Sequence, residues 1–248
     1  MFIPRQTKKE RKIIFITGAG LDAPSGIQTF RGTNGIWNGH DIKTVCDETT
    51  WKQNYTQVHQ FYNERRVELG KAQPNIAHKK IKEITDKYGK DNVFNITQNV
   101  DDLFERVGTE TLHVHGDLTK MECEACGENW DIGYNSFDIK EDRCPKCNSL
   151  KSVRPKIVFF YGRAPMYSYM FRAADYTMNP DTIMLVVGTM GNVINVDDIF
   201  LMGTPCYKIL VDVKLPPDIK KENLDKIILT GSEEGMLEVE KIIAERWD

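Results

Sequence analysis

Four of the six cysteines form two C-x2-C pairs, and this spacing is typical of a structural zinc site. Each pair brings two thiolates to one point, and four thiolates complete a tetrahedron that leaves no position for water. The sequence therefore predicts one structural zinc ion rather than a catalytic one; a disulfide-bonded loop or four unrelated thiols is the alternative. The predicted ligands are Cys123, Cys126, Cys144 and Cys147.

A glycine-rich turn follows the first apolar run of the chain and is a candidate phosphate-binding loop. The run ends in Gly18-Ala19-Gly20, and Ala23 completes a G-x-G-x-x-A pattern. Between a strand and the start of a helix, such glycines let the backbone approach a pyrophosphate. The pattern alone is weak evidence, and a plain tight turn is the alternative.

The elements that must position these residues alternate between β-rich runs and helical stretches. Nearly continuous apolar runs are typical of parallel strands that are covered on both faces. The sequence therefore predicts an α/β fold with a Rossmann-like, doubly wound parallel sheet, and a zinc ribbon inserted between the second and third strands. The predicted strands lie at 12–18, 92–98, 155–161, 182–188, 207–213 and 226–231, and the helices near 51–70, 74–88 and 233–247.

Composition excludes several classes of function. The 248-residue chain has a formal net charge of −3, which argues against general nucleic-acid binding. No apolar run approaches the roughly 20 residues that span a membrane, and the N-terminus lacks a secretory apolar segment. We therefore expect a monomeric cytosolic protein with reduced thiols and no nucleic-acid or membrane partner.

Several motifs occur together and in a characteristic order. They are GAGLDAPSGIQTFRG (18–32), TQNVDDL (97–103), HVHGDL (113–118), RPKIVFF (154–160) and GTMGNV (188–193). With the four cysteines, this set resembles the sirtuin family of NAD-dependent protein deacylases, from about residue 12 to residue 245. The resemblance implies NAD as co-substrate, one structural zinc ion, and acylated lysines of peptides and proteins as substrates.

The resemblance also divides the chain into three parts. It implies an NAD-binding, Rossmann-like domain over residues 1–31, 76–118 and 155–248. Residues 32–75 would form a helical segment with the cofactor loop and the acyl pocket. Residues 119–154 would form the zinc-ribbon module.

By the same resemblance, most of the motif residues contact the cofactor. Aromatic and charged residues of the first motif form a loop over NAD, and the T-Q-N-x-D residues line the ribose and hold the nicotinamide carboxamide. The turn after 182–188 approaches the adenine-side ribose and the phosphates. The implied cofactor residues are Gly18, Ala19, Gly20, Asp22, Phe30, Arg31, Gln98, Asn99, Asp101, His115, Gly188, Thr189, Met190 and Asp212.

His115 matches the catalytic histidine of the family, and Asn99 is implied to assist it. In the implied mechanism nicotinamide leaves, the acyl oxygen attacks the ribose, and His115 acts as general base on a ribose hydroxyl. The products are free lysine and O-acyl-ADP-ribose. The segment Val158, Phe159, Phe160 and Tyr161 would pair with the substrate peptide as an added strand.

Tyr62 and Arg65 lie one helical turn apart on the predicted helix near 51–70. A solvated surface pair is one interpretation. The other is the Tyr-x-x-Arg clamp of the bacterial-type class III branch, whose members remove succinyl and malonyl as well as acetyl groups. A phenol and a guanidinium can bind a carboxylate together, so the resemblance favours the clamp.

Several positions depart from the family pattern. Asp22 and Met190 replace common serines, and Asp212 replaces a common asparagine. A carboxylate that faces a pyrophosphate would be repulsive, so Asp22 predicts weakened NAD affinity unless a cation or hydroxyl intervenes. The stretch FFYGRAP (159–165) has one extra residue, which puts the register of the substrate segment in doubt.

Two other classes of function remain open on the sequence alone. One is an ADP-ribosyltransferase or NAD hydrolase on the same fold, and the other is a catalytically silent binding module. Retention of His115 and of the Tyr62/Arg65 pair favours deacylation over the first, since neither is required for simple transfer to water; binding of NAD would distinguish the second.

Overall fold

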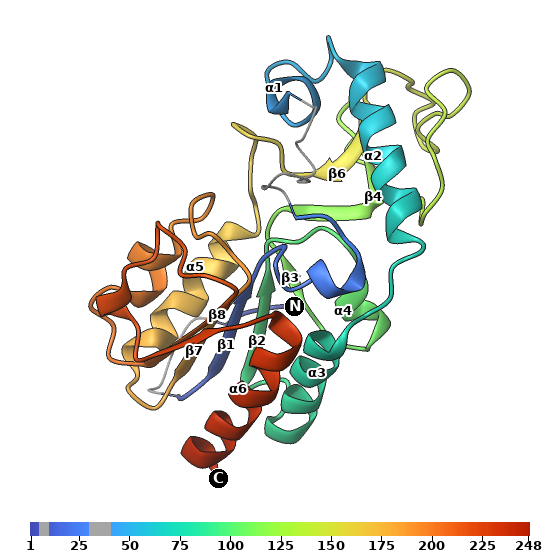
Figure 1. Ribbon diagram of the computed structural model, residues 1–248. Helices are drawn as coiled ribbons and strands as arrows, with labels where there is room; N and C mark the ends of the chain where they lie inside the picture. Colours follow the sequence, from blue (N-terminus) through green and yellow to red (C-terminus); the bar gives the residue numbers. More distant parts are fainter. Residues whose placement is uncertain (5–9, 30–40) are drawn as a thin grey trace.

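The protein folds into two lobes, and the computed structural model describes residues 1–4, 10–29 and 41–248 (Figure 1). The larger lobe is built on a parallel sheet and contains both termini. The smaller lobe holds a three-stranded sheet beside a long helix. The chain enters the smaller lobe twice, between the first two strands of the large sheet and again after its edge strand.

The large sheet has six strands, all paired in parallel. Its central strands are buried at every residue, as expected for parallel strands with helices on both faces. In spatial order the strands are β3 (Leu112–His113), β2 (Val93–Thr97), β1 (Ile13–Thr17), β7 (Ile183–Val187), β8 (Tyr207–Asp212) and β9 (Lys226–Leu229).

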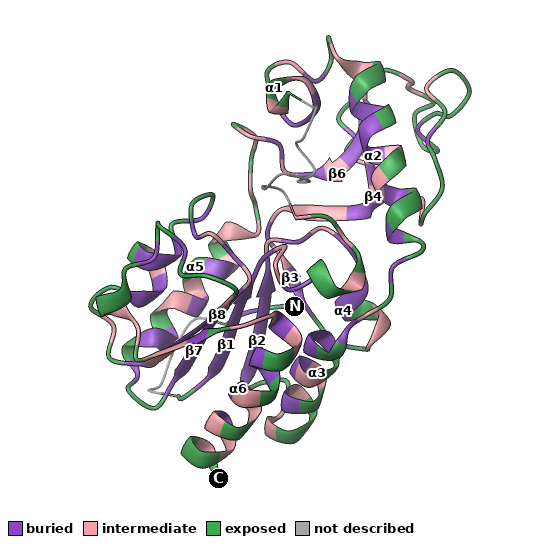
Figure 2. Ribbon diagram, in the orientation of Figure 1, coloured by how far each residue is buried: buried purple, intermediate pink, exposed green. Residues whose placement is uncertain are grey.

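Helices cover both faces of this sheet, and one apolar core lies on each face. Figure 2 shows that the strands between these two layers of helices are buried. One face packs on α3 (Ile76–Tyr88), α4 (Leu103–Arg106) and α6 (Ser232–Trp247), and the other on α5 (Tyr167–Asp175) and a π-helical turn (Asp197–Leu201). Short 3-10 turns lie at Ala23–Ser25, Tyr176–Met178 and Lys221–Asn223.

The small lobe combines an antiparallel sheet with two helices. Strand β4 (Gly116–Cys123) is central, between β5 (Asn129–Asp131) and β6 (Val153–Ile157). The helices are α1 (Ile42–Val45) and α2 (Tyr55–Leu69). Their apolar side chains and those of the β6 end form a separate core.

The predicted fold class is confirmed, and two predicted elements differ. The run 155–161 is not a buried strand of the large sheet. Its strand ends at Ile157 and pairs antiparallel with β4. The prediction was wrong because an apolar run does not encode which sheet it joins. The helix expected after the glycine turn is a single 3-10 turn, which Gly26 ends at φ 82°. Among the described residues, no helix is long and apolar enough to cross a membrane.

Candidate active site

The candidate site forms where the loops after β1 and β7 meet at the carboxyl edge of the large sheet. The chain proceeds from β1 to β2 on one side while β7 lies on the other, and open α/β sheets bind ligands at such a switch point. Gly20 N donates to the Gly188 carbonyl at 2.8 Å. A Cβ on Gly20 would lie 2.7 Å from Gly188 Cα, so the close approach requires glycine. Glycine-rich backbone of this kind can approach a pyrophosphate closely.

Polar side chains from β2 and β7 lie at the same edge. Gln98 Nε2 donates to Thr189 Oγ1 at 2.8 Å, and Asn99 Nδ2 donates to the Gly18 carbonyl at 3.0 Å. Asn99 is buried, yet its Oδ1 has no hydrogen-bond partner among the described residues. An unpaired buried acceptor is costly, so Oδ1 is available to a donor on a ligand such as a carboxamide. Asp101 is also buried here.

Asp22 turns into the interior instead of standing open in the loop. Its Oδ2 accepts from Asn99 Nδ2 at 2.6 Å, and its Oδ1 lies 3.2 Å from His78 Nε2. Burial, followed by the charge and a hydrogen bond of Asp101, raises the pKa of Asp22 well above its usual range. The carboxyl group therefore favours its neutral form; its Oδ2 is hydrogen-bonded to Asn99, and its Oδ1 has no hydrogen-bond partner among the described residues.

The Asp22, His78 and Asp101 cluster is close enough to suggest a metal site, since its ligand atoms lie within 4.8 Å of one another. The tautomer of His78 argues against it. His78 Nδ1 accepts from Asn75 N at 3.3 Å in the capping box of α3. Burial lowers the pKa of His78 to about 4, so the ring is neutral and Nε2 carries its proton. A protonated nitrogen has no lone pair with which to ligate a metal.

His115 lies between β3 and β4, and backbone groups fix it on both sides. Its carbonyl accepts from Val158 N at 2.8 Å, and its Nδ1 lies 3.0 Å from the Gln98 carbonyl. Gly116 follows at φ 96°, where a Cβ would lie 2.2 Å from the Lys156 carbonyl oxygen. Burial lowers the pKa of His115, and the Gln98 carbonyl partly offsets this effect. The imidazole is therefore neutral at pH 7, as a general base must be.

His113 is occupied by other residues of the protein. Its Nδ1 lies 3.0 Å from the Asn99 carbonyl and its Nε2 lies 3.0 Å from Glu105 Oε1. Burial disfavours the charged ring, but the Glu105 carboxylate outweighs burial and raises the pKa of His113. A histidine tied to a carboxylate in this way has no free lone pair for a substrate.

The helix pair Tyr62 and Arg65 lies beside the predicted substrate segment. Tyr62 is 5% exposed and stacks on Phe159, with ring centroids 5.9 Å apart. The Arg65 guanidinium lies 4.5 Å from the Phe61 ring centroid, and it pairs with Glu64 at 3.3 Å and with a second glutamate of α2. Burial raises the pKa of Tyr62, while the nearby charge of Arg65 acts to lower it. Cys46 and Arg154 act on the pKa of Tyr62 more strongly than Arg65 does, so Arg65 is one of several groups near the phenol.

The extra residue of the substrate segment is absorbed in a turn. Gly162 N donates to the Phe159 carbonyl at 2.9 Å, and Tyr161 adopts φ 66° within this turn. Its side chain is 83% exposed as a result. Phe160 still forms a parallel bridge with Asp47. The insertion therefore projects one aromatic ring outward and leaves the neighbouring pairing in place.

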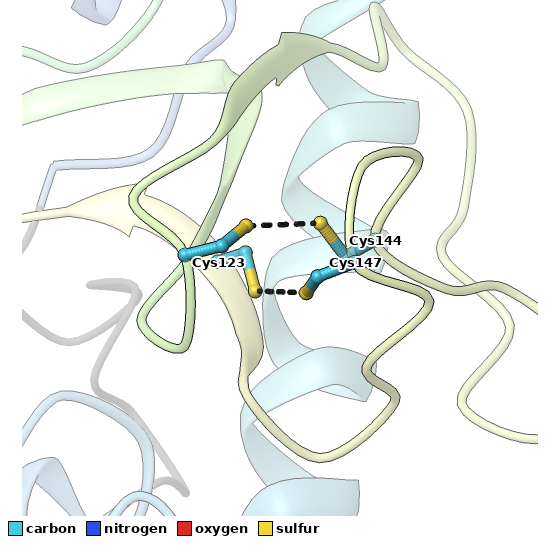
Figure 3. Close-up of side chains that lie close together, drawn as sticks. Cys123, Cys144 and Cys147 are labelled. Carbon is cyan, nitrogen blue, oxygen red and sulfur yellow. Dashed lines mark hydrogen bonds between the residues drawn. The ribbon is translucent and has the colours of Figure 1, made fainter.

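The four predicted zinc ligands converge from two loops of the small lobe (Figure 3). Cys123 Sγ lies 3.6 Å from Cys147 Sγ, and Cys126 Sγ lies 3.6 Å from Cys144 Sγ. Bonds of about 2.3 Å to a tetrahedral Zn²⁺ would separate sulfur atoms by about 3.8 Å. These distances fit a zinc tetrahedron and are too long for disulfides.

The remaining predicted cofactor residues lie at the same edge of the sheet or outside the described residues. Ala19 and Met190 are half-buried in the two loops, and Asp212 ends β8, where burial raises its pKa. Phe30 and Arg31 lie outside the described residues. Sequence reasoning missed His78 and also Tyr167, whose hydroxyl contacts His115 Nε2 at 2.9 Å. No motif marks either residue.

Glycine loops at the switch point of a parallel sheet, a half-buried neutral histidine beside them and a four-cysteine ribbon in a second lobe are together typical of a dinucleotide-dependent α/β enzyme. The family can be stated from the comparison with known proteins. The model of the Sir2 family matches residues 18–195, and the chain belongs to this family.

Relatives and solved structures agree with that assignment. An NAD-dependent protein deacylase of Helicobacter hepaticus is 39% identical over 93% of this chain and 96% of its own length. One from Campylobacter jejuni is 38% identical over 88% and 90%. A Sir2 homologue mutant solved with ADP-ribose matches with TM-score 0.82 and 28% identity, over 96% of this chain and 94% of its own. A Sir2 homologue–NAD complex matches with TM-score 0.78 and 28% identity, over 96% and 91%.

Proposed function

We propose that this member of the Sir2 family is an NAD-dependent protein-lysine deacylase that releases nicotinamide and O-acyl-ADP-ribose. The observation that carries the proposal is the state of His115. The Gln98 carbonyl can only accept a hydrogen bond, so His115 Nδ1 carries the proton and Nε2 keeps the lone pair. A neutral imidazole with its lone pair at a dinucleotide crevice is equipped to take a proton from a sugar hydroxyl.

The residues around the crevice fit the dinucleotide. When bound, NAD supplies a glycosidic bond whose cleavage leaves ADP-ribose as the acyl acceptor. The loops that contain Gly20 and Gly188 pack backbone against backbone at the switch point of the sheet, where they would hold the phosphates of NAD. The unpaired Oδ1 of Asn99 would accept from the carboxamide of the nicotinamide. His115 would then hold a ribose hydroxyl and remove its proton.

We further propose that acidic acyl groups are substrates alongside acetyl groups, through Tyr62 and Arg65. The buried phenol stacks on Phe159 of the substrate segment, and Arg65 supplies the positive charge nearby. Glu64 and Glu68 hold the guanidinium in this structure, and both are about half exposed. An acyl carboxylate in a drier environment would be the stronger partner for Arg65.

The test offers the purified protein NAD and matched acetyl-, malonyl- and succinyl-lysine peptides. We expect O-acyl-ADP-ribose and free lysine in mass spectra, and no turnover after His115→Asn. The variant keeps a side chain of similar width, so circular dichroism should be unchanged. Protein-bound or free ADP-ribose without deacylated peptide would instead indicate a transferase or an NAD hydrolase. No effect of NAD plus peptide on thermal unfolding would indicate a silent binding module.

A further inference from the structure

The lone pair of His115 is already occupied before any ligand arrives. Tyr167 OH lies 2.9 Å from His115 Nε2, and the ring centroids are 6.0 Å apart. Because Nδ1 donates to the Gln98 carbonyl, Nε2 can only accept. The phenol O–H must therefore be the donor in this contact.

Tyr167 is held in place and does not approach His115 by chance. It is the first residue of α5, and its backbone N donates to the Ala164 carbonyl at 3.1 Å. Its ring packs edge-on against Phe171. Burial raises the pKa of Tyr167, so the phenol keeps its proton at neutral pH. An anchored, protonated phenol is a dependable donor.

We propose that Tyr167 is a positioning residue that occupies the base position of His115 in the free enzyme and yields it to a sugar hydroxyl of the dinucleotide. The inference rests on the proposed function, because it requires His115 Nε2 to be the base. One lone pair accepts one well-aligned donor, so the phenol and the sugar hydroxyl exclude each other there. Until displacement, Tyr167 and the Gln98 carbonyl together fix the plane of the imidazole.

This arrangement has a consequence for proton binding. A donor on Nε2 stabilises the neutral ring, so removing the phenol O–H raises the pKa of His115 in the free enzyme. The groups that face the ring are Gln98 at the end of β2 and Tyr167 on α5, and no described charged side chain forms a hydrogen bond or ion pair with it. Once the sugar hydroxyl occupies Nε2, Tyr167 no longer affects the pKa of His115.

The experiment compares Tyr167→Phe with Tyr169→Phe. Tyr169 lies on the same helix but packs on Phe2, with ring centroids 5.7 Å apart. NAD affinity is measured by calorimetry. The pH dependence of kcat/KM for NAD and of kcat is measured at a saturating concentration of an acetyl-lysine peptide. We expect Tyr167→Phe to bind NAD roughly two- to tenfold more tightly, since one hydrogen bond no longer has to break. The acid limb of kcat/KM should move to higher pH while that of kcat keeps its position, because only the former reports the free enzyme.

The outcomes separate this inference from the proposed function. Wild-type or weaker NAD binding by Tyr167→Phe, with an unmoved acid limb of kcat/KM, would overturn the inference, as would equal shifts in Tyr169→Phe. His115→Asn is measured in parallel. Turnover by His115→Asn would remove the proposed base instead. An inactive His115→Asn beside a Tyr167→Phe enzyme that behaves like wild type would leave the proposed function standing.

Discussion

The carboxyl group of Asp22 is buried beside that of Asp101. Asn99 Nδ2 donates to one of its oxygens, and His78 Nε2 lies 3.2 Å from the other without forming a hydrogen bond. Burial and the neighbouring carboxylate raise the pKa of Asp22 well above its ordinary 3.8. The folded state therefore favours the protonated acid over a pH range in which the unfolded chain ionises, and folding is linked to proton uptake.

Replacing Asp22 with Asn removes this titration and keeps the shape of the side chain. Because the pKa is raised in the folded state, the contribution of Asp22 to stability is complete at low pH and is lost as pH rises through the folded pKa. The loss is up to about 1.4 kcal/mol for each pH unit between the unfolded and the folded pKa. Between pH 5 and 8 we expect the free energy of unfolding of the wild type to fall relative to Asp22→Asn. Urea unfolding measures it, with Asp91→Asn at an exposed carboxyl as control. Parallel pH courses for wild type and Asp22→Asn would contradict the prediction.

In the proposed function, Arg65 would distinguish acidic acyl groups from acetyl groups. An acetyl group makes no ion pair, whereas a succinyl carboxylate would gain a charge-assisted hydrogen bond of about 1.5–3 kcal/mol. We expect Arg65→Met to lower kcat/KM for succinyl-lysine by about 10- to 100-fold, and that for acetyl-lysine by no more than about threefold. Lys71→Met, which removes an exposed cation just beyond α2, is the matched control. Equal losses on both substrates would make Arg65 a structural residue.

The residues that could and could not be predicted differ in how far their partners lie along the chain. The cysteine pairs carry their geometry in local spacing, and His115 is marked by the glycine that follows it. The partner of Asp22 is His78, and the partner of His115 is Tyr167, which lies 52 positions away. The type of residue 22 suggested a charge facing the ligand. Its burial depends on helix α3, whose docking no local pattern encodes.

At the scale of elements, the start of β4 is fixed by one glycine. Gly116 has φ 96°, and a Cβ there would meet the Lys156 carbonyl oxygen at 2.2 Å and Ile157 Cα at 2.9 Å. Separation of β4 from β6 would also move His115, whose carbonyl accepts from Val158 N. The close pairing of these strands is therefore part of the site.

We expect Gly116→Ala to destabilise the protein by about 3 kcal/mol or more, from the left-handed conformation and the clash together. Deacylation should be lost even at temperatures where the variant is folded. Gly203→Ala isolates the first effect, because Gly203 has φ 70° and no atom within 4 Å of its added Cβ. That control should cost only about 1–2 kcal/mol. Thermal unfolding and peptide turnover measure both variants; equal behaviour of the two would mean that the clash relaxes freely.

Periodicity predicted most strands and long helices but not their partners. The runs at 12–18, 92–98, 182–188 and 207–213 became buried parallel strands because both of their faces are apolar. The run at 155–161 has the same character, yet it lies in the other sheet. Antiparallel pairing with β4 depends on the chain between them folding back, which the zinc-ligand loops accomplish. Pairing is a property of the tertiary structure rather than of the run.

At the scale of the whole molecule, α2 contacts the zinc-ligand loops and also carries the residues of the proposed acyl clamp. One stripe of the helix donates hydrogen bonds to carbonyls in the loops and strands between the cysteine pairs and β6. The four donors recur at helical spacing: Tyr55 OH to Leu150, His59 Nε2 to Val153, Asn63 Nδ2 to Phe137 and Arg66 Nε to Asn135, over 2.7–3.0 Å. Tyr62 lies along the same stripe as these donors, and Arg65 lies to one side of it. The position of the proposed clamp therefore depends on loops that the metal would hold together.

Removal of zinc should consequently loosen α2 while the large sheet stays folded. The binding energy of a four-thiolate zinc site is largely the folding energy of its loops. Chelation of the metal should therefore unfold these loops, and α2 would lose its hydrogen bonds to their carbonyl groups. Hydrogen exchange should show lost protection in α2 (Tyr55–Leu69) and retained protection in α3 (Ile76–Tyr88), which packs on the large sheet and serves as the internal control. Deacylase activity should fall with α2 protection and return when Zn²⁺ is added back. Equal loss in both helices would show that the lobes unfold as one unit, and full protection in α2 after verified metal loss would show that the helix does not depend on the ribbon.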